Sequence, residues 1–300
     1  MSCRSRIGRT LDSTFARIWG AARWLWGRAL PAEQRWRSAG RQRVLVIAPH
    51  PDDEVAGVGG TILLHQGAGD QVTVLHVTDG RRSRAGGLAP EAMARRRHQE
   101  ARDSVKALGV ARWEWLGLFE GDWADRDLAA PLERLVRELE PHVIYVPSRV
   151  DFHPEHYRVA RVTADVLGAG GPSTSAAVVR VYQVQVPLTR ILVNLVNPVL
   201  EVFPELLRAC DLYASQEGSL RSPLRLKRYG AFAHRIPGVA EEFWEMEVAA
   251  YVALHAGKPS RSPDETFRGL RRLSPGDPLA FLRGAAERRR LARLATSRDR

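Results

Sequence analysis

A short polar motif stands at the point where an apolar strand must end and a helix must begin. Residues 44–48 form a β-branched apolar run typical of a buried strand, and residues 55–65 have the pattern of a helix with small residues in its first turns. Two prolines within the motif end the strand and restrict the backbone around the polar side chains. These polar residues are His50, Asp52, Asp53 and Glu54. Because adjacent carboxylates repel one another, the cluster favours a bound divalent cation: zinc, iron or manganese rather than calcium.

A second motif of the same kind follows a later strand. Residues 143–147 are another apolar strand, and residues 157–167 another helix. The polar residues between them are Asp151, His153, Glu155 and His156. Two such strand-to-helix turns meet at the carboxyl edge of a parallel sheet, which is where ligands bind in open α/β folds. The two motifs together therefore predict a metal site at that edge.

The two motifs resemble the paired signatures of a known family. Residues 49–54, followed by Gly59 and Gly60, and residues 153–156 look like the signatures of the LmbE-like (PIG-L) de-N-acetylases. Members of this family are zinc-dependent amidases that remove acetyl groups from N-acetylglucosamine units. Weaker similarities cover residues 78–80, 97–101, 108–110, 213–216 and 240–243, so the resemblance spans roughly residues 43–250.

The resemblance and coordination chemistry together assign roles to the motif residues. His50, Asp53 and His156 would hold Zn²⁺, with Fe²⁺ or Mn²⁺ as alternatives, and leave one position open for water. Asp52 would be the general base. His153 would stabilise the oxyanion of the tetrahedral intermediate.

Further residues are expected to support the site or to contact the substrate. Glu54 would tie its loop through hydrogen bonds to backbone groups, and Glu155, where relatives usually have Asp, would orient His153. Arg97 belongs to an Arg-x-x-Glu pair that lies near the substrate in relatives. Without the resemblance, Arg97 and Glu100 would be an intrahelical ion pair. The residues expected to bind substrate are Arg97, Asp79 and Asp151.

Two loops at the same edge carry further polar groups. Residues 78–90 include three arginines, which suit either a phosphate on the substrate or a solvated loop. Residues 117–127 contain three side chains able to reach a sugar: Glu120, Asp122 and Trp123. His76, within the predicted strand 71–77, is expected to belong to the core rather than to bind a ligand.

The alternation of strands and helices predicts an α/β fold, a Rossmann-like, mostly parallel sheet with helices on both faces and the metal site at the carboxyl edge of its strands. Further strands are predicted over residues 112–116 and 176–186, and helices over 91–108 and 128–140, the latter capped by Asp127. The later segments are less regular. Residues 187–207 are strongly apolar and are either a lid over a lipid-bearing substrate or added core, residues 208–216 are helical, 219–236 polar and irregular, and 241–254 a helix or strand.

Charge divides the chain into three parts: residues 1–42, 43–257 and 258–300. Residues 1–43 hold 10 arginines and 2 acids, and residues 258–300 hold 12 basic and 5 acidic residues, so the two ends carry +8 and +7 while the rest of the chain carries −4 of the net charge of +11. The last part is expected to be a partly disordered tail with a short basic helix over 281–294. Residues 5–30 have the pattern of an amphipathic helix with arginines on one side, which suits either peripheral membrane contact or packing on the domain. Its apolar residues are Ile7, Leu11, Phe15, Ile18, Trp19, Ala22, Leu25 and Trp26.

The predicted function is metal-dependent hydrolysis of the acetamide of an N-acetylated amino sugar, releasing acetate and a free amine. The two amphipathic or apolar segments favour a lipid-linked glycan or a lipopolysaccharide-type precursor as substrate. Two alternatives stay open: deacetylation of a soluble thiol-glycoside precursor, and a non-catalytic, metal-binding, membrane-associated scaffold.

The expected location is the cytoplasm, with a peripheral position on the inner face of the cytoplasmic membrane. Two cysteines without zinc spacing or a disulfide framework suit a reducing compartment, and no apolar run reaches the roughly 18 residues of a membrane span. The basic ends lack the patterns of nucleic-acid-binding modules, so nucleic acid is not an expected partner. The sequence does not specify the aglycone or the oligomeric state.

Overall fold

The computed structural model describes residues 34–35, 38, 40–83, 85–149, 151, 153–170, 176–186, 188 and 192–256. The predicted helix over residues 5–30 and the predicted tail over residues 258–300 lie outside these described residues.

The described residues form one eight-stranded sheet in the order β1-β7-β8-β6-β5-β2-β3-β4. The strands are β1 (Gln34–Arg35), β2 (Arg43–Ala48), β3 (Gln71–Thr78), β4 (Arg112–Leu118), β5 (Val143–Pro147), β6 (Val178–Tyr182), β7 (Leu195–Pro198) and β8 (Ala240–Glu247). Strands β2 to β6 are parallel, whereas β8 runs antiparallel to both β6 and β7. The order of the five parallel strands reverses direction between β2 and β5, which is the switch point where doubly wound sheets bind ligands.

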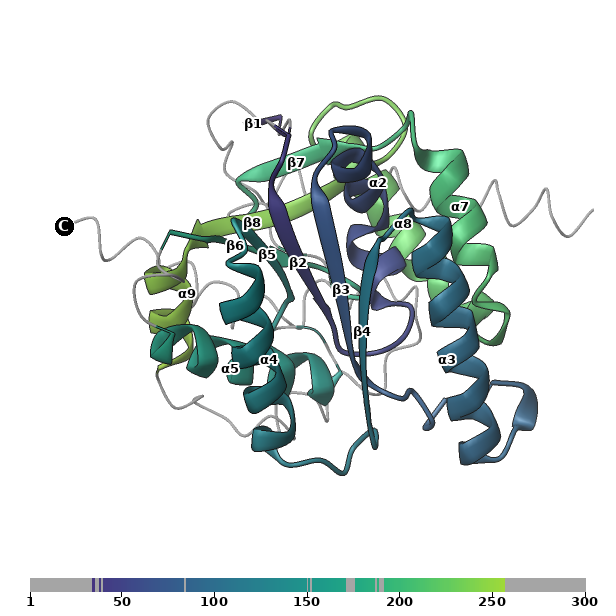
Figure 1. The fold of residues 1–300 in the computed structure, drawn as a ribbon. Helices are drawn as coiled ribbons and strands as arrows, with labels where there is room; N and C mark the ends of the chain where they lie inside the picture. The colour runs from purple at the N-terminus through teal and green to yellow at the C-terminus, as the bar shows by residue number, and fades with distance from the viewer. Residues whose placement is uncertain are drawn as a thin grey trace, which may run out of the picture.

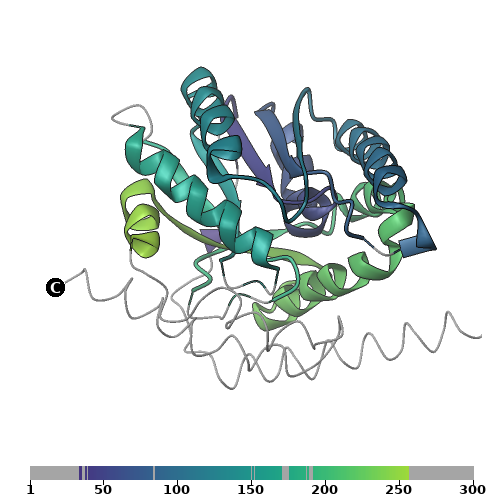
Figure 2. The same cartoon turned by 90° about the horizontal axis from the view of Figure 1, so that it is seen from below.

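Helices cover both faces of the sheet, as Figures 1 and 2 show. The helical elements are the π-helix η1 (Glu54–Val58), α2 (Gly59–Gly67), the 3₁₀ turn η2 (Ala85–Gly87), α3 (Pro90–Ala107), α4 (Asp125–Leu139), α5 (Pro154–Ala169), α7 (Phe203–Asp211), the 3₁₀ turn η3 (Ala214–Gln216), α8 (Glu217–Ala233) and α9 (Val248–His255). Helices α4, α5 and α9 pack on one face, while α2, α3 and α7 pack on the other, with α8 beside η1 and β8. The predicted α/β fold, mostly parallel with helices on both faces, is confirmed.

Side chains of β2 point alternately to the two faces of the sheet, so the core has two layers. Leu45 and Ile47 belong to the layer under α4 and α5, whereas Val44 and Val46 belong to the layer under α2 and α3. This division follows from strand geometry, since successive side chains point to opposite faces. A central strand buried on both faces must therefore be apolar throughout, as β2 is.

Several sequence predictions differ from the structure. Residues 219–236, predicted to be irregular, lie largely in α8, because packing against β8 overrides the breaking tendency of Pro223 and Gly230. Helix α4 begins at Asp125 rather than at residue 128, and Asp127 caps it from the third position by accepting from the Ala124 N–H. Strand β6 is shorter than the predicted 176–186.

The apolar stretch 187–207 contributes core through most of its described apolar residues, although Leu200 is exposed. Its buried apolar residues are Leu188, Leu192, Val193, Leu195, Val196, Val199 and Leu206. They pack in the two core layers, and part of the stretch forms β7 and the start of α7. Of the two interpretations of this segment, added core is the one these residues support. Among the helices of the described part of the chain, none has the length and apolar character needed to cross a membrane.

Candidate functional site

The first motif forms a tight turn that packs directly against neighbouring elements. Thr78 holds the end of β2, with its N–H and hydroxyl both donating to the Pro49 carbonyl, at 3.0 and 2.8 Å. A Cβ atom at Gly57 would lie 2.2 Å from the ring of Tyr182, and one at Gly60 would lie 2.7 Å from Val199. These glycines therefore let η1 and α2 approach β6 and the chain after β7 without a side chain in between.

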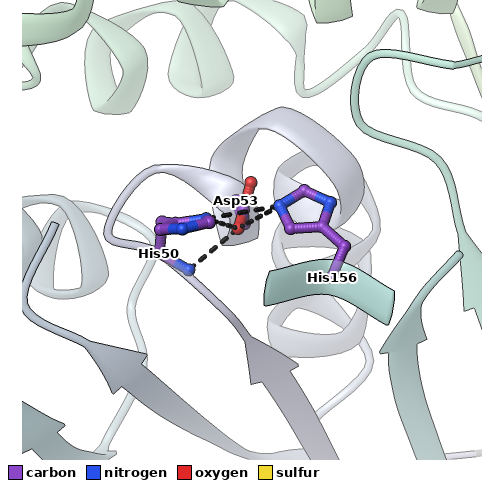
Figure 3. A group of neighbouring side chains, drawn as sticks. All are labelled: His50, Asp53 and His156. Atoms are coloured by element: carbon purple, nitrogen blue, oxygen red, sulfur yellow. Dashed lines mark hydrogen bonds and ion pairs between the residues drawn. The ribbon is translucent and has the colours of Figure 1, made fainter. Parts of the chain in front are cut away.

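Three side chains from the two motifs converge on one point (Figure 3). Nδ1 of His50 lies 3.2 Å from Oδ2 of Asp53, and Nε2 of His156 lies 3.1 Å from the same oxygen. The two ring nitrogens are 3.3 Å apart. Ligands bound tetrahedrally to zinc at about 2.0–2.1 Å lie about 3.3 Å from one another, so this triangle has the size that a zinc ion requires. Sequence analysis predicted these three residues as ligands, and the structure brings them together as a candidate metal-binding group.

Each histidine of this triangle turns its other ring nitrogen toward a carboxylate. Nδ1 of His156 lies 3.3 Å from Asp151, and Nε2 of His50 lies 3.6 Å from Glu120. A carboxylate behind a histidine is the usual arrangement at metal sites, because it fixes the ring and its tautomer. Asp151 was predicted to contact substrate, but it is completely buried behind His156 and also accepts from the Gln185 N–H.

Carboxylates outnumber histidines when the neighbours of the triangle, Asp151 and Glu120, are included. Burial disfavours a charged His156, but the carboxylates of Asp53 and Asp151 outweigh burial and raise its pKa well above the ordinary value. Burial likewise opposes charge on His50, whose pKa the hydrogen bond and charge of Asp53 nevertheless raise. Burial would also raise the pKa of Asp53, yet the two histidines hold it well below its usual range. The carboxylates thus favour a cation at this point, either protons on the rings or a metal ion.

Asp52 borders the cavity beside the triangle in an unusual backbone conformation. Its φ of 109° is rare for a residue with a side chain, and such strain persists only where the surroundings hold it. Arg97 supplies part of that hold by donating to the Pro51 carbonyl and, at 3.1 Å, to the Asp52 carboxylate. Burial raises the Asp52 pKa to about 7 against the opposing charge of Arg97, which makes this carboxyl group suited to exchanging protons near neutral pH.

Glu54 holds the same turn from beneath through more partners than the predicted backbone contacts. It accepts from the Asp52 N–H at 3.1 Å, and it also accepts from the Tyr213 hydroxyl at 2.6 Å and the Ser104 hydroxyl at 3.2 Å. His76 contacts the same carboxylate at 2.8 Å and is fully buried, which confirms its assignment to the core. The fully buried Glu54 carboxylate therefore joins the turn to β3, α3 and the chain after α7.

Arg97 points into the site rather than along its own helix. It is buried and borders the cavity, in agreement with the expected position near the substrate. Its predicted intrahelical partner, Glu100, instead pairs with Arg96 at 2.9 Å and accepts from Ser215. The expectation that Arg97 and Glu100 form an intrahelical ion pair is therefore wrong.

His153 borders the cavity next to His50, with the two ring centroids 4.3 Å apart. The carboxylate near it is Glu120, whose Oε1 lies 3.7 Å from His153 Nε2. Glu155, predicted to orient His153 with its side chain, contacts His153 only through its backbone N–H, which donates to Nδ1 at 3.3 Å. The Glu155 carboxylate instead accepts from the Gly121 N–H at 2.8 Å and from the Trp123 indole at 2.7 Å. The side chain differs from the prediction because both of these donors belong to residues 117–127, a loop within reach of the long Glu155 side chain. Trp123 is consequently buried rather than available to a sugar, and Asp122 is exposed.

Asp79 shapes the neighbouring loop and does not border the cavity. Its carboxylate accepts from both the backbone and the side chain of Arg81, at 3.1 and 2.6 Å, and is almost fully buried. Asp79 therefore holds the loop after β3 in place, which differs from the predicted contact with substrate.

The cavity has a volume of about 190 Å³ and lies over the triangle, Asp52 and His153. Of the arginines in residues 78–90, Arg82 borders the cavity. The bordering residues that the sequence does not single out are the polar residues Ser83, Gln185 and Ser219 and the apolar residues Ala56, Val184, Leu220 and Pro223. Gln216, which belongs to the family-like segment 213–216, also borders it and donates to Ser83 at 2.7 Å. The lining of the cavity thus contains both polar and apolar side chains.

Comparison with protein families supports the interpretation of the two motifs. Residues 45–167 match the model of the family described as PIG-L: GlcNAc-PI de-N-acetylase. A 1D-myo-inositol 2-acetamido-2-deoxy-alpha-D-glucopyranoside deacetylase of Kineococcus radiotolerans is 30% identical over 189 residues, which are 49% of this chain and only 52% of that protein. A probable N-acetyl-alpha-D-glucosaminyl L-malate deacetylase 2 of Bacillus cereus is 26% identical over 68% of this chain and 97% of its own length.

Solved structures share the fold. The N,N'-diacetylchitobiose deacetylase of Pyrococcus horikoshii has a TM-score of 0.60 and 24% identity, over 70% of this chain and 85% of that chain. The 4-carboxy-2-hydroxymuconate hydratase GalB of Pseudomonas putida has a TM-score of 0.58 and 20% identity, over 68% and 95% of the two chains. Because the same fold also occurs in a hydratase, the fold alone does not determine the reaction.

Proposed function

Because residues 45–167 form a domain of the PIG-L (LmbE-like) family, we propose that this protein is a zinc-dependent deacetylase of an N-acetylglucosamine-containing substrate. The observation that carries the proposal is the metal-sized triangle of His50, Asp53 and His156 with the Asp52 carboxyl group beside it at one cavity. The reaction hydrolyses the acetamide and releases acetate and a free amine.

The side chains around the cavity match the steps of amide hydrolysis. Asp52 takes a proton from the attacking water and returns it to the nitrogen as the C–N bond breaks. Arg97 holds Asp52 in place, and His153 donates a hydrogen bond to the oxygen on which negative charge develops. Zinc, when bound, makes water a nucleophile at neutral pH and polarises the acetamide carbonyl.

The proposal is tested by zinc analysis and by acetate release together. The purified protein should contain close to one zinc-class ion per chain. Candidate substrates are diacetylchitobiose, N-acetylglucosaminyl malate, N-acetylglucosaminyl inositol and N-acetylglucosaminyl phosphatidylinositol, each assayed for a new primary amine. A zinc-loaded protein that releases acetate from none of these and from no other N-acetylhexosaminide would contradict the proposal.

The finer proposal is that the substrate is lipid-linked and that the enzyme works at the cytoplasmic face of a membrane. Two features support it: the name of the matched family model, which includes a phosphatidylinositol, and the Arg- and Trp-bearing amphipathic pattern of residues 5–30. The apolar stretch 187–207 adds little support, because most of its described apolar residues are core. The relatives named for inositol and malate glycosides favour the soluble alternative.

Liposome flotation distinguishes the lipid-linked interpretation from the soluble-substrate interpretation. Full-length protein should float with anionic vesicles, since each arginine near such a surface contributes roughly 1 kcal/mol. Added salt should weaken flotation without abolishing it, because burial of the apolar side chains does not depend on salt. A truncated protein starting at Arg41 should not float. If both proteins float equally, or if neither floats at any salt concentration, the soluble-substrate interpretation takes precedence.

A further inference from the structure

A buried ion pair lies directly against the helical segment that follows the metal-binding turn. Lys227 of α8 contacts Glu241 of β8 at 2.6 Å, and their side chains are only 4% and 1% exposed. Helix α8 packs against β8 and η1, the element from which α2 continues. Glu241 belongs to the family-like segment 240–243, to which neither the fold nor the proposed reaction assigns a purpose.

The pair is inserted where η1 meets α2. Glu241 accepts from the Gly60 N–H at 3.0 Å and from the Thr61 N–H at 2.8 Å, and it also accepts from the Thr61 hydroxyl at 2.6 Å. Lys227 donates to the Ala56 carbonyl at 2.7 Å. In an uninterrupted helix this carbonyl would accept from residue 60 in an α-turn or from residue 61 in a π-turn. The ion pair therefore provides partners for both sides of the junction.

The junction itself is irregular, and it connects to the catalytic turn. Val58 departs from helical geometry, with φ of −132° and ψ of 0°. Ala56, which Lys227 holds by its carbonyl, donates its N–H to the Asp52 carbonyl at 2.9 Å. Asp53 is the residue at the start of η1. Lys227 thus reaches the strained Asp52 through a single residue.

Stability alone is a poor explanation for this pair. Removing two charges from water costs several kcal/mol per ion, and well-packed apolar replacements are often as stable or more stable. We propose that Lys227 and Glu241 are positioning residues that hold the η1–α2 junction in the form that presents Asp52 and Asp53 to the metal site. This inference rests on the proposed zinc-dependent function.

The test is the zinc affinity of a variant without either charge. Lys227→Met combined with Glu241→Gln removes both charges together, so no buried charge is left unpaired. Competition with a chelator should show zinc affinity reduced on the order of 10- to 100-fold, the effect typical of residues behind metal ligands. In the zinc-saturated variant, kcat should fall with little change in KM, since the cavity walls that bind substrate are unchanged.

The chain offers a matched control. His234, which directly follows α8, and Glu242 of β8 form a second buried pair at 2.9 Å, and Glu242 also accepts from Gln183, which follows β6, at 3.0 Å. His234→Gln combined with Glu242→Gln should lower thermal stability and leave zinc affinity within a few-fold of wild type. Equal losses of zinc affinity in the two double variants would show that the Lys227–Glu241 pair is only structural, and wild-type affinity without Lys227 and Glu241 would overturn the proposal directly.

Folding is checked by near-UV circular dichroism. If the double variant does not fold, Lys227→Met alone decides, because Glu241 then keeps its three donors from Gly60 and Thr61 while Ala56 loses its partner. This variant must also lose zinc affinity, and wild-type affinity in it would again overturn the proposal. A wild-type protein that binds zinc but deacetylates nothing contradicts the proposed function and leaves the affinity comparison valid, whereas one that binds no zinc contradicts both.

Discussion

The His50–Asp53–His156 triangle and the cluster around His65 each place buried histidine beside aspartate, but in different arrangements. In the triangle, three ligand atoms lie within 3.3 Å of one another beside a cavity. Around His65 the contacts form a chain: Nδ1 contacts Asp70 at 2.6 Å, and Nε2 contacts the Tyr145 hydroxyl at 3.0 Å. Arg180 then donates to Tyr145 at 2.7 Å and to Glu245 at 2.7 Å.

The two clusters shift the pKa of histidine in opposite directions. Burial lowers the pKa of His65 to about 4, since Asp70 opposes it only in part and Arg180 adds to it. Burial acts on His156 in the same sense, but two carboxylates reverse it and raise the pKa well above the ordinary value. One cluster is thus complete with a neutral ring, while the other favours a cation.

A buried histidine beside an aspartate is therefore not by itself a sign of function in this protein. What distinguishes the candidate site is convergence of several lone pairs on one point, an excess of carboxylates and an adjacent cavity. Because of these differences, we expect substitutions in the two clusters to affect deacetylation differently.

Removing a triangle histidine should have the largest effect. His156→Ala should leave the protein without zinc and reduce deacetylation to background, because two ligands do not replace three. His65→Gln should keep one zinc per chain and a rate near that of wild type. Elemental analysis and an amine-release assay on both variants make the comparison. If His156→Ala keeps its zinc, the ligand assignment is wrong.

Asp52→Asn should reduce the rate while leaving the metal in place. The expected loss is on the order of 10²- to 10⁴-fold, the usual contribution of a general base. Zinc content and thermal stability should stay near those of wild type, since Asn keeps the size of the side chain. A fully active Asp52→Asn protein would rule out the assigned role, and a wild type with no deacetylase activity would favour the scaffold alternative.

Asp151→Asn should weaken the metal site from behind. Without its negative charge, the His156 ring is less basic and less firmly oriented, so zinc affinity should fall about 10- to 100-fold. Asp70→Asn is the matched control, because Asp70 contacts His65 in the same way. That variant should lose stability but not zinc affinity. Equal affinities of Asp151→Asn and wild type would return Asp151 to the predicted role in substrate binding.

The sequence predicted the fold and the centre of the site because both depend on short-range patterns. Apolar runs followed by prolines defined β2 and β5, and turns at the carboxyl edge placed His50 and His156 together. Helix α8 was not predicted, because its contacts with β8 stabilise a helix despite the helix-breaking residues Pro223 and Gly230. Gly230 lies against Glu242 on β8, and the same helix buries Lys227, a residue that a pattern search places on the surface.

The outer part of the site could not be predicted, because it depends on where long side chains reach. Glu155 extends to the 117–127 loop, and Glu120 from that loop occupies the position near His153. Asp151 turns inward toward His156 rather than toward the cavity. These contacts depend on the conformations of loops that are distant in sequence, and the spacing of residues along the chain does not predict such conformations.

In the cluster around His65, protonation should change the stability of the protein and not the rate of deacetylation. The pKa of His65 is about 4 in the folded protein and near 6.5 in the unfolded chain, so between these values only the unfolded chain takes up the proton. The contribution of His65 to stability is therefore complete above about pH 6.5 and is lost as the pH falls toward 4. A shift of this size corresponds to about 3 kcal/mol.

Denaturant unfolding of wild type and His65→Gln at pH 7, 6, 5 and 4.5 measures this loss. The variant should be less stable at pH 7, because Asp70 and Tyr145 lose their partner, but its free energy of unfolding should fall less steeply toward acid pH. His255, whose pKa burial also lowers to about 4, is present in both proteins and cancels in the difference. Parallel curves for the two proteins would mean that His65 is charged when buried, and the contrast between the two clusters would then rest on geometry and the cavity alone.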